Sequence, residues 1–264
     1  MSRVEPGRTA WVELGDGVLA RRHAELDLTT GLVLGGERAL VIDTGGDHRQ
    51  GAELAAAVRA VTTLPVTVVL THAHFDHCFG TAAFLPAPVL AHPGCRAALD
   101  RTAAAQRDHW AAHYRADGDP ATAVALEETE PVPPGPAPPA LDLGGREVVP
   151  VAPGPGHTDH DLAVHVPDAG VLFAGDLLES GAPPDYEDAH PLAWADAVAA
   201  LLALDVGTYV PGHGDPMTPA QARAQHAELE VVAALARAVA AGELAAAGAE
   251  ARSPHPGVPW PRET

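Results

Sequence analysis

Residues 66–77 read Val-Thr-Val-Val-Leu-Thr-His-Ala-His-Phe-Asp-His. The apolar first half of this stretch is typical of a β-strand buried on both faces. Three histidines and one aspartate then follow within six positions. Alternation along an extended segment points His72 and His74 to one side, and a helical turn after them can bring Asp76 and His77 towards the same point. Packing does not require these residue types here, so the stretch predicts a metal site.

Three further polar residues stand beside predicted strands in glycine-rich turns. They are His157 in Pro-Gly-His-Thr, Asp176 in Phe-Ala-Gly-Asp and His213 in Val-Pro-Gly-His-Gly. Imidazole nitrogens and carboxylate oxygens are ligands that zinc, manganese and ferrous iron accept, whereas a thiolate-rich set is absent from a chain with two cysteines. The pattern therefore predicts that these residues join the first cluster.

Hydrophobic periodicity outward from this stretch predicts strands and helices in two similar halves, without a sequence repeat. This order suits an αββα sandwich as readily as a doubly wound sheet. Residues 131–139 are rich in proline, and we expect a stiff surface connection there without hydrogen-bonded regular structure. The expected strands span 11–14, 18–20, 32–34, 39–42, 66–70, 88–91, 140–143, 147–151, 162–166, 171–174 and 208–210, and the expected helices 51–61, 80–84, 95–117, 192–204 and 219–241.

Composition narrows the range of partners. The chain has 264 residues, 47% of them hydrophobic, with 16 arginines, no lysine and 35 acidic residues, for a formal charge of −19. Such a surface repels phosphate backbones, which argues against nucleic acid as a partner.

Two cysteines are too few for a disulfide framework, residues 1–17 lack the pattern of a secretion signal, and no apolar run is long enough to cross a membrane. We expect a cytoplasmic protein that does not bind membranes.

Taken together, these motifs resemble those of the metallo-β-lactamase fold superfamily of hydrolases, from about Val12 to His213. The resemblance implies an α/β (α+β) fold, a four-layer αββα sandwich, with a single domain over residues 1–250 and an irregular tail over 251–264. It also implies that Asp43, in Val-Ile-Asp-Thr-Gly, orients a ligand histidine. By the same resemblance, one metal is held by His72, His74 and His157, a second by Asp76, His77 and His213, and Asp176 bridges the two.

Two adjacent divalent ions lower the pKa of a shared water towards 7, which makes hydroxide available at neutral pH, and one ion can polarise a carbonyl or phosphoryl oxygen. Asp76 could hold this nucleophile in line and later protonate the leaving group, which makes it the candidate catalytic residue. We expect two divalent ions, zinc first with iron or manganese as alternatives. The predicted reaction is hydrolysis of an ester, thioester, lactone or amide in a small molecule, and the oligomeric state stays open.

Departures from known branches shape this prediction. Asp176 stands where the commonest di-zinc β-lactamase subclass carries cysteine, which argues against that subclass. The absence of lysine argues against an enzyme that binds a glutathione thioester through basic side chains. The alternative enzyme is a mononuclear iron dioxygenase of the persulfide-oxidising type, which would use only the positions of His72, His157 and Asp176. A non-enzymatic, metal-stabilised interaction protein is a third interpretation. Metal content separates the two enzymes, because the hydrolase would contain two zinc ions per chain and the dioxygenase one iron ion.

Several neighbouring residues have open roles at this level. His160 and Asp161 suit either the pocket or an exposed loop, and the segment 180–194, with Tyr186 and His190, is a candidate pocket wall. Trp194 begins an apolar helix and is predicted to belong to the core. Cys78 is interpreted as a small buried residue without a catalytic role.

Overall fold

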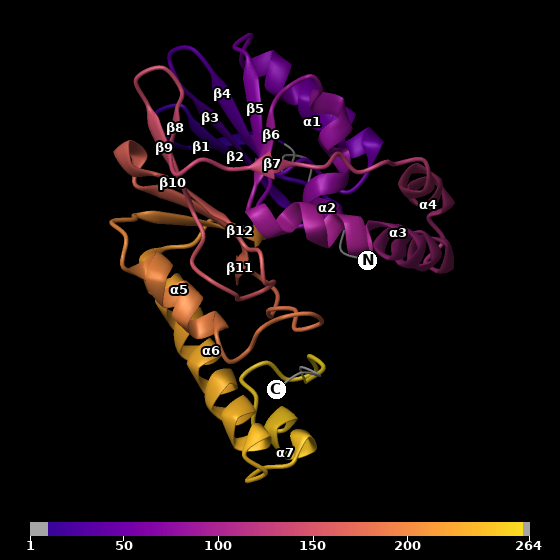
Figure 1. The fold of residues 1–264 in the computed structure, drawn as a ribbon, viewed down its shortest axis with the longest axis vertical. Helices are drawn as coiled ribbons and strands as arrows, with labels where there is room; N and C mark the ends of the chain where they lie inside the picture. The colour runs from indigo at the N-terminus through magenta and orange to yellow at the C-terminus, as the bar shows by residue number, and fades with distance from the viewer. Residues whose placement is uncertain (1–9, 261–264) are drawn as a thin grey trace.

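Two β-sheets lie face to face in the computed structural model, which describes residues 10–260 (Figure 1). The first sheet has the strand order β1-β2-β3-β4-β5-β6-β7 and the second the order β12-β11-β10-β9-β8. The strands are β1 (Trp11–Gly15), β2 (Val18–Arg22), β3 (Thr29–Leu34), β4 (Ala39–Ile42), β5 (Val66–Val69), β6 (Val89–Ala91), β7 (Gly135–Pro136), β8 (Leu141–Asp142), β9 (Glu147–Val151), β10 (Ala163–Val166), β11 (Val171–Glu179) and β12 (Thr208–His213).

Helices cover the outer face of each sheet. Helices α1, α3 and α4 pack on the first sheet, and α5 and α6 pack on the second, where they run side by side below β11 and β12 in Figure 1. The helices are α1 (His48–Val61), α2 (Phe75–Cys78), α3 (Pro93–Ala116), α4 (Pro120–Glu127), α5 (Trp194–Leu202), α6 (Pro219–Ala240) and α7 (Ala246–Glu250), with 3-10 turns η1 (Phe79–Phe84) and η2 (Pro167–Ala169). The four-layer αββα sandwich is thus confirmed.

Three buried clusters fill the three spaces between the four layers, and strand alternation assigns residues to them. In β4, Val41 packs towards the helices while Leu40 and Ile42 face the second sheet. In β11, Phe173 faces the first sheet while Leu172 packs towards α5 and α6. Because successive side chains of a strand point to opposite faces, a strand inside the sandwich must be apolar on both. This is why the inner strands read as continuous apolar runs.

Short connections place strand ends and helix starts beside one another. Asp47 begins α1 by accepting hydrogen bonds from the backbone N–H groups of Arg49 and Gln50. Thr218 and Gln221 cap α6 reciprocally, with Pro219 at its first turn. Strands β4 and β5 run parallel in the first sheet and β11 and β12 in the second. Their carboxyl ends gather polar residues at one edge of the sandwich.

Local structure differs from the sequence prediction in several places. Within residues 131–139, Gly135 and Pro136 form the edge strand β7 beside β6, so the expectation of no regular pairing is wrong there. An edge position tolerates proline because no further strand needs its missing N–H. The short helices α4 and α7 were not predicted, although Asp119 caps α4 and Pro120 starts it. Strand β11 continues to Glu179, so Asp176 lies within a strand and not in a turn.

No helix among residues 10–260 is long and apolar enough to cross a membrane. The described part of the predicted tail, residues 251–260, contains turns but neither helix nor strand. It is nevertheless attached, because His255 contacts the Tyr186 hydroxyl group and Trp260 packs against the cluster under α5 and α6.

Candidate metal centre

The seven sequence-predicted ligand residues converge at one end of the sandwich. His72 and His74 lie in the turn after β5, and Asp76 and His77 in the short helix α2. The second sheet supplies the others: His157 after β9, Asp176 from β11 and His213 from the end of β12. All seven are buried except His74 and His213, which are partly exposed. Residues more than 130 positions apart therefore meet only because the two sheets pack face to face.

The first group consists of His72, His74, His157 and Asp176, whose ligand atoms lie within 4.8 Å of one another. His157 Nε2 is 3.0 Å from His74 Nδ1. Asp176 Oδ2 lies 3.6 Å from His72 Nε2 and 3.5 Å from His157 Nε2.

The second group consists of Asp76, His77 and His213. His213 Nε2 lies 3.3 Å from both His77 Nε2 and Asp76 Oδ2. Asp176 reaches this group as well, with Oδ1 3.0 Å from His77 Nε2 and Oδ2 3.4 Å from His213 Nε2. Its carboxylate thus stands between the two groups.

This donor set fits divalent metal ions. Zinc–ligand bonds of about 2.0–2.2 Å in tetrahedral geometry separate neighbouring donor atoms by roughly 3.3–3.6 Å, and the contacts above span 3.0–3.6 Å. His72 Nε2 is also buried without a hydrogen-bond partner in the described part of the chain. A buried ring nitrogen without a partner is costly unless a ligand or ion completes its bonding. The geometry and the unpaired nitrogen both suit metal binding.

Asp43 fixes two of the ligand rings from behind. Its Oδ2 accepts hydrogen bonds from His77 Nδ1 and from the Thr71 hydroxyl group, both at 2.8 Å. Thr71 Oγ1 in turn accepts from His72 Nδ1 at 3.0 Å. Since each Nδ1 donates away from the site, each Nε2 is left to face it. Asp43 therefore occupies the place expected of an orienting carboxylate.

Two other ligand rings are held from different segments. His213 Nδ1 donates to the Leu26 carbonyl oxygen at 2.8 Å, which leaves Nε2 for the site. His74 is turned the other way, because its Nε2 lies 3.3 Å from Asp188 Oδ2 and its Nδ1 faces His157. The Asp188 carboxylate lies in the segment 180–190, so this segment is tied directly to the first group.

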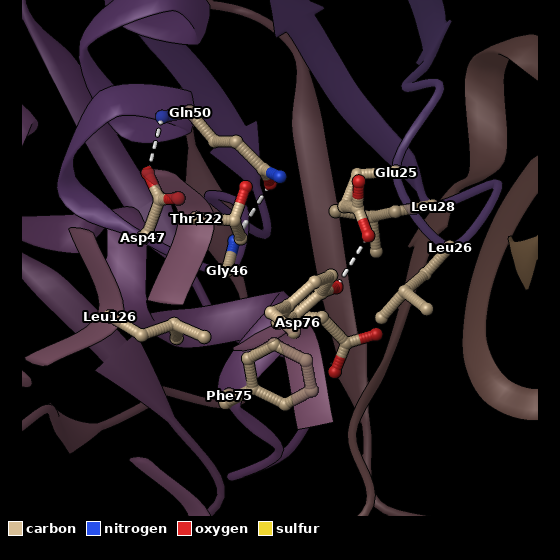
Figure 2. A pocket seen from close by; sticks show the side chains of 11 residues that line it. Glu25, Leu26, Leu28, Gly46, Asp47, Gln50, Phe75, Asp76, Thr122 and Leu126 are labelled. Carbon is tan, nitrogen blue, oxygen red and sulfur yellow. Dashed lines mark hydrogen bonds between the residues drawn. The ribbon is translucent and has the colours of Figure 1, made fainter. Parts of the chain in front are cut away.

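Figure 2 shows a small pocket of about 10 Å³ close to the site, which Leu26, Phe75 and Asp76 help to line. At its edge the Tyr114 hydroxyl group, from α3, donates a hydrogen bond to Glu25. Leu26 has a φ of 51°, in the left-handed region that non-glycine residues rarely adopt. The contact with α3 helps to hold this strained backbone where its carbonyl reaches His213.

Glycines let the strands approach the ligands. A Cβ atom at Gly212 would lie 1.8 Å from Asp176 Oδ1, so any side chain there would displace the bridging carboxylate. Gly175 has a φ of 55° and lies opposite Thr71, where a Cβ atom would come within 2.8 Å of the threonine side chain. Glycine is required at both positions for the two sheets to close around the site.

Electrostatic surroundings separate the histidines into two kinds. Burial lowers the pKa of His72 well below its usual value and that of His157 to about 4, so both rings are neutral at pH 7. Burial acts in the same sense on His77 and His213, but nearby carboxylates, Asp176 foremost, outweigh it and raise the pKa of each well above its usual value. Ligand imidazoles must be neutral, so an ion in the second group displaces protons and binds more tightly as pH rises.

Five of the seven ligand residues line an open cleft of about 760 Å³ between α3 and the segment 180–190; they are His74, Asp76, His157, Asp176 and His213. Beyond the ligands, its wall carries the carboxylates of Asp159, Asp185, Glu187 and Asp188. Arg101 is the single arginine among the described residues that line it. The cleft is large enough for a small organic molecule and is predominantly acidic.

The residues with open roles now have positions. His160 is buried; its Nε2 accepts from the Ala73 N–H at 3.2 Å and its Nδ1 contacts Asp159, so it braces the turn that carries the first ligands. Asp161 accepts from the backbone and hydroxyl of Thr158, and burial raises its pKa to about 7. The segment 180–194, the predicted pocket wall, does line the cleft, and of its two singled-out residues His190 faces the cleft whereas Tyr186 does not.

The remaining three belong to the interior. Tyr186 is buried, with its hydroxyl group 2.6 Å from His255 Nδ1. Trp194 is fully buried in the core, as predicted, with its indole N–H donating to the Leu177 carbonyl oxygen. Cys78 is also buried, as predicted, and burial raises the pKa of its thiol well above the usual value.

Sequence reasoning missed one carboxylate. Glu179, at the end of β11, places an oxygen within 4.8 Å of the ligand atoms of Asp176 and His213. Burial raises its pKa well above the usual value, and the charge of Asp176 adds to the shift. Its spacing of three from Asp176 predicts opposite faces of a regular strand, so the sequence carried no signal for it.

Comparison with known proteins places this arrangement in a family. The family model described as the metallo-beta-lactamase superfamily matches residues 26–213, a range that contains all seven residues. The chain belongs to the metallo-beta-lactamase superfamily. The resemblance deduced from the sequence motifs is thereby confirmed.

Relatives within the superfamily include different hydrolases. An acyl-coenzyme A thioesterase, MBLAC2, of Gallus gallus is 29% identical over 166 residues, and the match spans 59% of either chain. A metallo-beta-lactamase type 2 of Bacillus sp. (strain 170) is 26% identical over 214 residues, which cover 78% of this chain and 74% of the relative. Superfamily membership and these relatives indicate that the chain is a metallo-hydrolase.

Solved structures agree on the fold. The metallo-beta-lactamase from Pontibacter korlensis has a TM-score of 0.68 at 19% identity and covers 84% of this chain and 98% of its own. The metallo-beta-lactamase FIM-1 from Pseudomonas aeruginosa, in its mono-zinc form, has a TM-score of 0.64 at 19% identity. The match covers 85% of this chain and 96% of that chain.

Proposed function

We propose that this member of the superfamily is a two-metal hydrolase, zinc being the first choice of metal, that cleaves an ester, thioester, lactone or amide bond in a small molecule. The observation that supports this most directly is the pair of ligand groups sharing Asp176 on the wall of an open cleft. A single ion would need only the first group. The close packing of Asp76, His77 and His213 into a second group favours two.

The roles of the residues follow from their positions. His72, His74 and His157 would hold one ion, Asp76, His77 and His213 the other, and Asp176 would contact both. When bound, such ions lower the pKa of a water molecule and polarise a carbonyl oxygen.

Asp76 is the proposed catalytic residue. Burial would raise its pKa, but His77 and His213 outweigh that effect and lower it, so the carboxylate is ionised at neutral pH. It can accept a proton from the attacking water molecule and then pass that proton to the leaving group.

The charge of the cleft bears on the substrate. We propose a neutral or cationic molecule, because carboxylates outnumber the one arginine on the wall and would repel an anion. Coenzyme A thioesters carry several phosphate charges and suit this wall poorly. A small molecule is the only partner that the proposal requires.

Metal analysis paired with a substrate panel tests the function. Elemental analysis of metal-replete protein should give close to two zinc per chain, with turnover on neutral or cationic esters, lactones, thioesters or amides. One iron per chain with oxygen uptake would instead support the dioxygenase alternative. Absence of turnover across the whole panel in fully loaded protein would reject the hydrolase.

Two variants sharpen the result. Asp176→Ala should lower metal content and hydrolysis together, since it removes the carboxylate shared by both groups. Cys78→Ala, which changes a buried thiol outside both groups, should leave both nearly unchanged. Full activity in Asp176→Ala would rule out the bridging role.

A further inference from the structure

Glu179 is a further carboxylate beside the second ligand group and the shared Asp176, and the predicted ligand set does not include it. Its carboxylate oxygen, a carboxylate oxygen of Asp176 and a ring nitrogen of His213 all lie within 4.8 Å of one another. Two donors on opposite sides of one ion stand about 4.2 Å apart at bond lengths near 2.1 Å. The 4.8 Å limit that groups Glu179 with Asp176 and His213 is close to this separation.

An irregularity in the second sheet turns Glu179 towards the site. Gly175 pairs with Pro211 and Glu179 with His213, so β11 advances four residues while β12 advances two. Extra residues in one strand of a pair break the regular alternation of faces. As a result, Asp176 and Glu179 share one side despite their odd spacing.

Backbone contacts hold Glu179 in that position. Its N–H donates to the Gln225 side-chain oxygen, from α6, at 3.1 Å. The next N–H, of Ser180, donates to the His213 carbonyl oxygen at 3.1 Å. The carboxylate is therefore carried on a fixed backbone directly beside a ligand residue.

The Glu179 carboxyl group lies within 4.8 Å of a carboxylate oxygen of Asp176, so the two groups repel each other when both are ionised. No arginine forms an ion pair with Glu179 within residues 10–260. Grouped, poorly hydrated carboxylates repel one another unless a positive ion or protonated base neutralises them.

We propose that Glu179 is a ligand of the second metal ion, together with Asp76, His77, His213 and the bridging Asp176. The inference rests on the proposed two-metal function and deepens it. The first metal position then has three imidazole ligands and the shared carboxylate of Asp176. The second metal position has three carboxylate ligands, of Asp76, Asp176 and Glu179, and two imidazole ligands. Oxygen-rich sites suit manganese better than imidazole-rich sites do. The two positions should therefore differ in metal preference, with Mn²⁺ competing best at the second.

Metal titration of the 264-residue chain tests this proposal. Metal-free wild type, Glu179→Gln and Glu187→Gln are each titrated with Zn²⁺ and, separately, with Mn²⁺ by calorimetry, and the bound metal is counted by elemental analysis. Glu187→Gln removes the same charge from the same cleft without touching a ligand group, so it controls for long-range electrostatics.

The expected result is specific to one position. Glu179→Gln should bind the first Zn²⁺ as wild type does and the second at least about tenfold more weakly. Mn²⁺ binding at the second position should be lost within the tested range. Glu187→Gln should bind both ions like wild type. Glu179→Asp, which keeps a carboxylate on a shorter side chain, should fall between wild type and Glu179→Gln.

Other outcomes overturn the assignment. Two ions bound by Glu179→Gln with wild-type affinities would show that Glu179 is not a ligand, even if hydrolysis fell. Equal weakening at both positions would point to a structural role. If Glu179→Gln does not fold, as judged by circular dichroism, wild-type affinity in Glu179→Asp overturns the proposal by itself.

The same titrations separate this inference from the proposed function. Wild type that binds one ion and still hydrolyses its substrate would reject the role of Glu179 and keep the hydrolase. Wild type that binds two ions with the Glu179 dependence described, but hydrolyses nothing, would keep Glu179 as a ligand and reject the hydrolase.

Discussion

Replacing Asp43 with asparagine should weaken both metal positions at once. The Asp43 carboxylate is 1% exposed and accepts three hydrogen bonds of 2.8 Å, from the Thr71 N–H, the Thr71 hydroxyl group and His77 Nδ1. His77 belongs to the second ligand group and is held directly. His72 belongs to the first group and is held through Thr71 Oγ1. One carboxylate thus orients a ligand ring in each group.

The magnitude follows from the donors that would lose their acceptor. An asparagine amide places an NH₂ group where one carboxylate oxygen stood, so in either orientation it faces at least one buried donor. Leaving such a donor unpaired costs about 1–3 kcal/mol, and we expect the free energy of unfolding to fall by this amount. Loss of a carboxylate that orients a ligand histidine typically lowers metal affinity about 10–100-fold. We expect that loss for both ions.

Urea denaturation of metal-free protein and competition of Zn²⁺ against a chelator measure the two effects. Thr71→Val is the matched variant, because it removes the hydroxyl link to His72 and keeps the Asp43–His77 contact. It should weaken the first position and spare the second. Asp43→Asn with both zinc affinities within about twofold of wild type would refute this account of how the rings are held.

Four further predictions address other contacts. Asp188→Asn should lower zinc affinity at the first position about tenfold in chelator competition and spare the second, because Asp188 contacts only His74 among the ligands. Trp194→Ala should lower the free energy of unfolding in urea by about 3–5 kcal/mol, since the indole is fully buried; a loss below about 1 kcal/mol would contradict that packing. Burial lowers the pKa of His23 to about 4, so the unfolded chain takes up a proton that the folded chain does not between about pH 6.5 and 4. Stability should therefore fall as pH falls through that window, by at most about 3 kcal/mol from this group, and urea titrations of His23→Gln should show a shallower slope than wild type. A chelator should lower the melting temperature of loaded protein, because an ion at 100 times its Kd stabilises the folded state by about 2.7 kcal/mol; an unchanged melting temperature would mean that these groups hold no ion.

Much of the architecture could be predicted from the sequence because it depends on short-range patterns. The apolar runs at residues 39–42 and 66–70 marked strands covered on both faces, and these strands lie inside the sandwich. The candidate ligands were recognisable for the same reason, since His72, His74 and His77 stand together in the chain. Residue type and spacing are enough where the chemistry is local.

Other features depended on contacts between distant segments. The pairing of Gly135 with Leu90 at a sheet edge, the Asp188 carboxylate beside His74 and the Tyr186 hydroxyl group beside His255 join residues that no spacing rule connects. The segment 180–194 illustrates the difference, because it was predicted as a pocket wall but its sequence could not tell which side chains face inward.

The sequence by itself determined the layer pattern and the types of residue available to bind metal. Tertiary structure alone decided that Glu179 joins Asp176 on the same side of β11. The physical reason is that a side chain's direction in a regular strand follows from its position, whereas an irregular register is set by what the neighbouring strand and helix hold in place. Here those partners are His213 and Gln225, which lie 34 and 46 positions further along the chain.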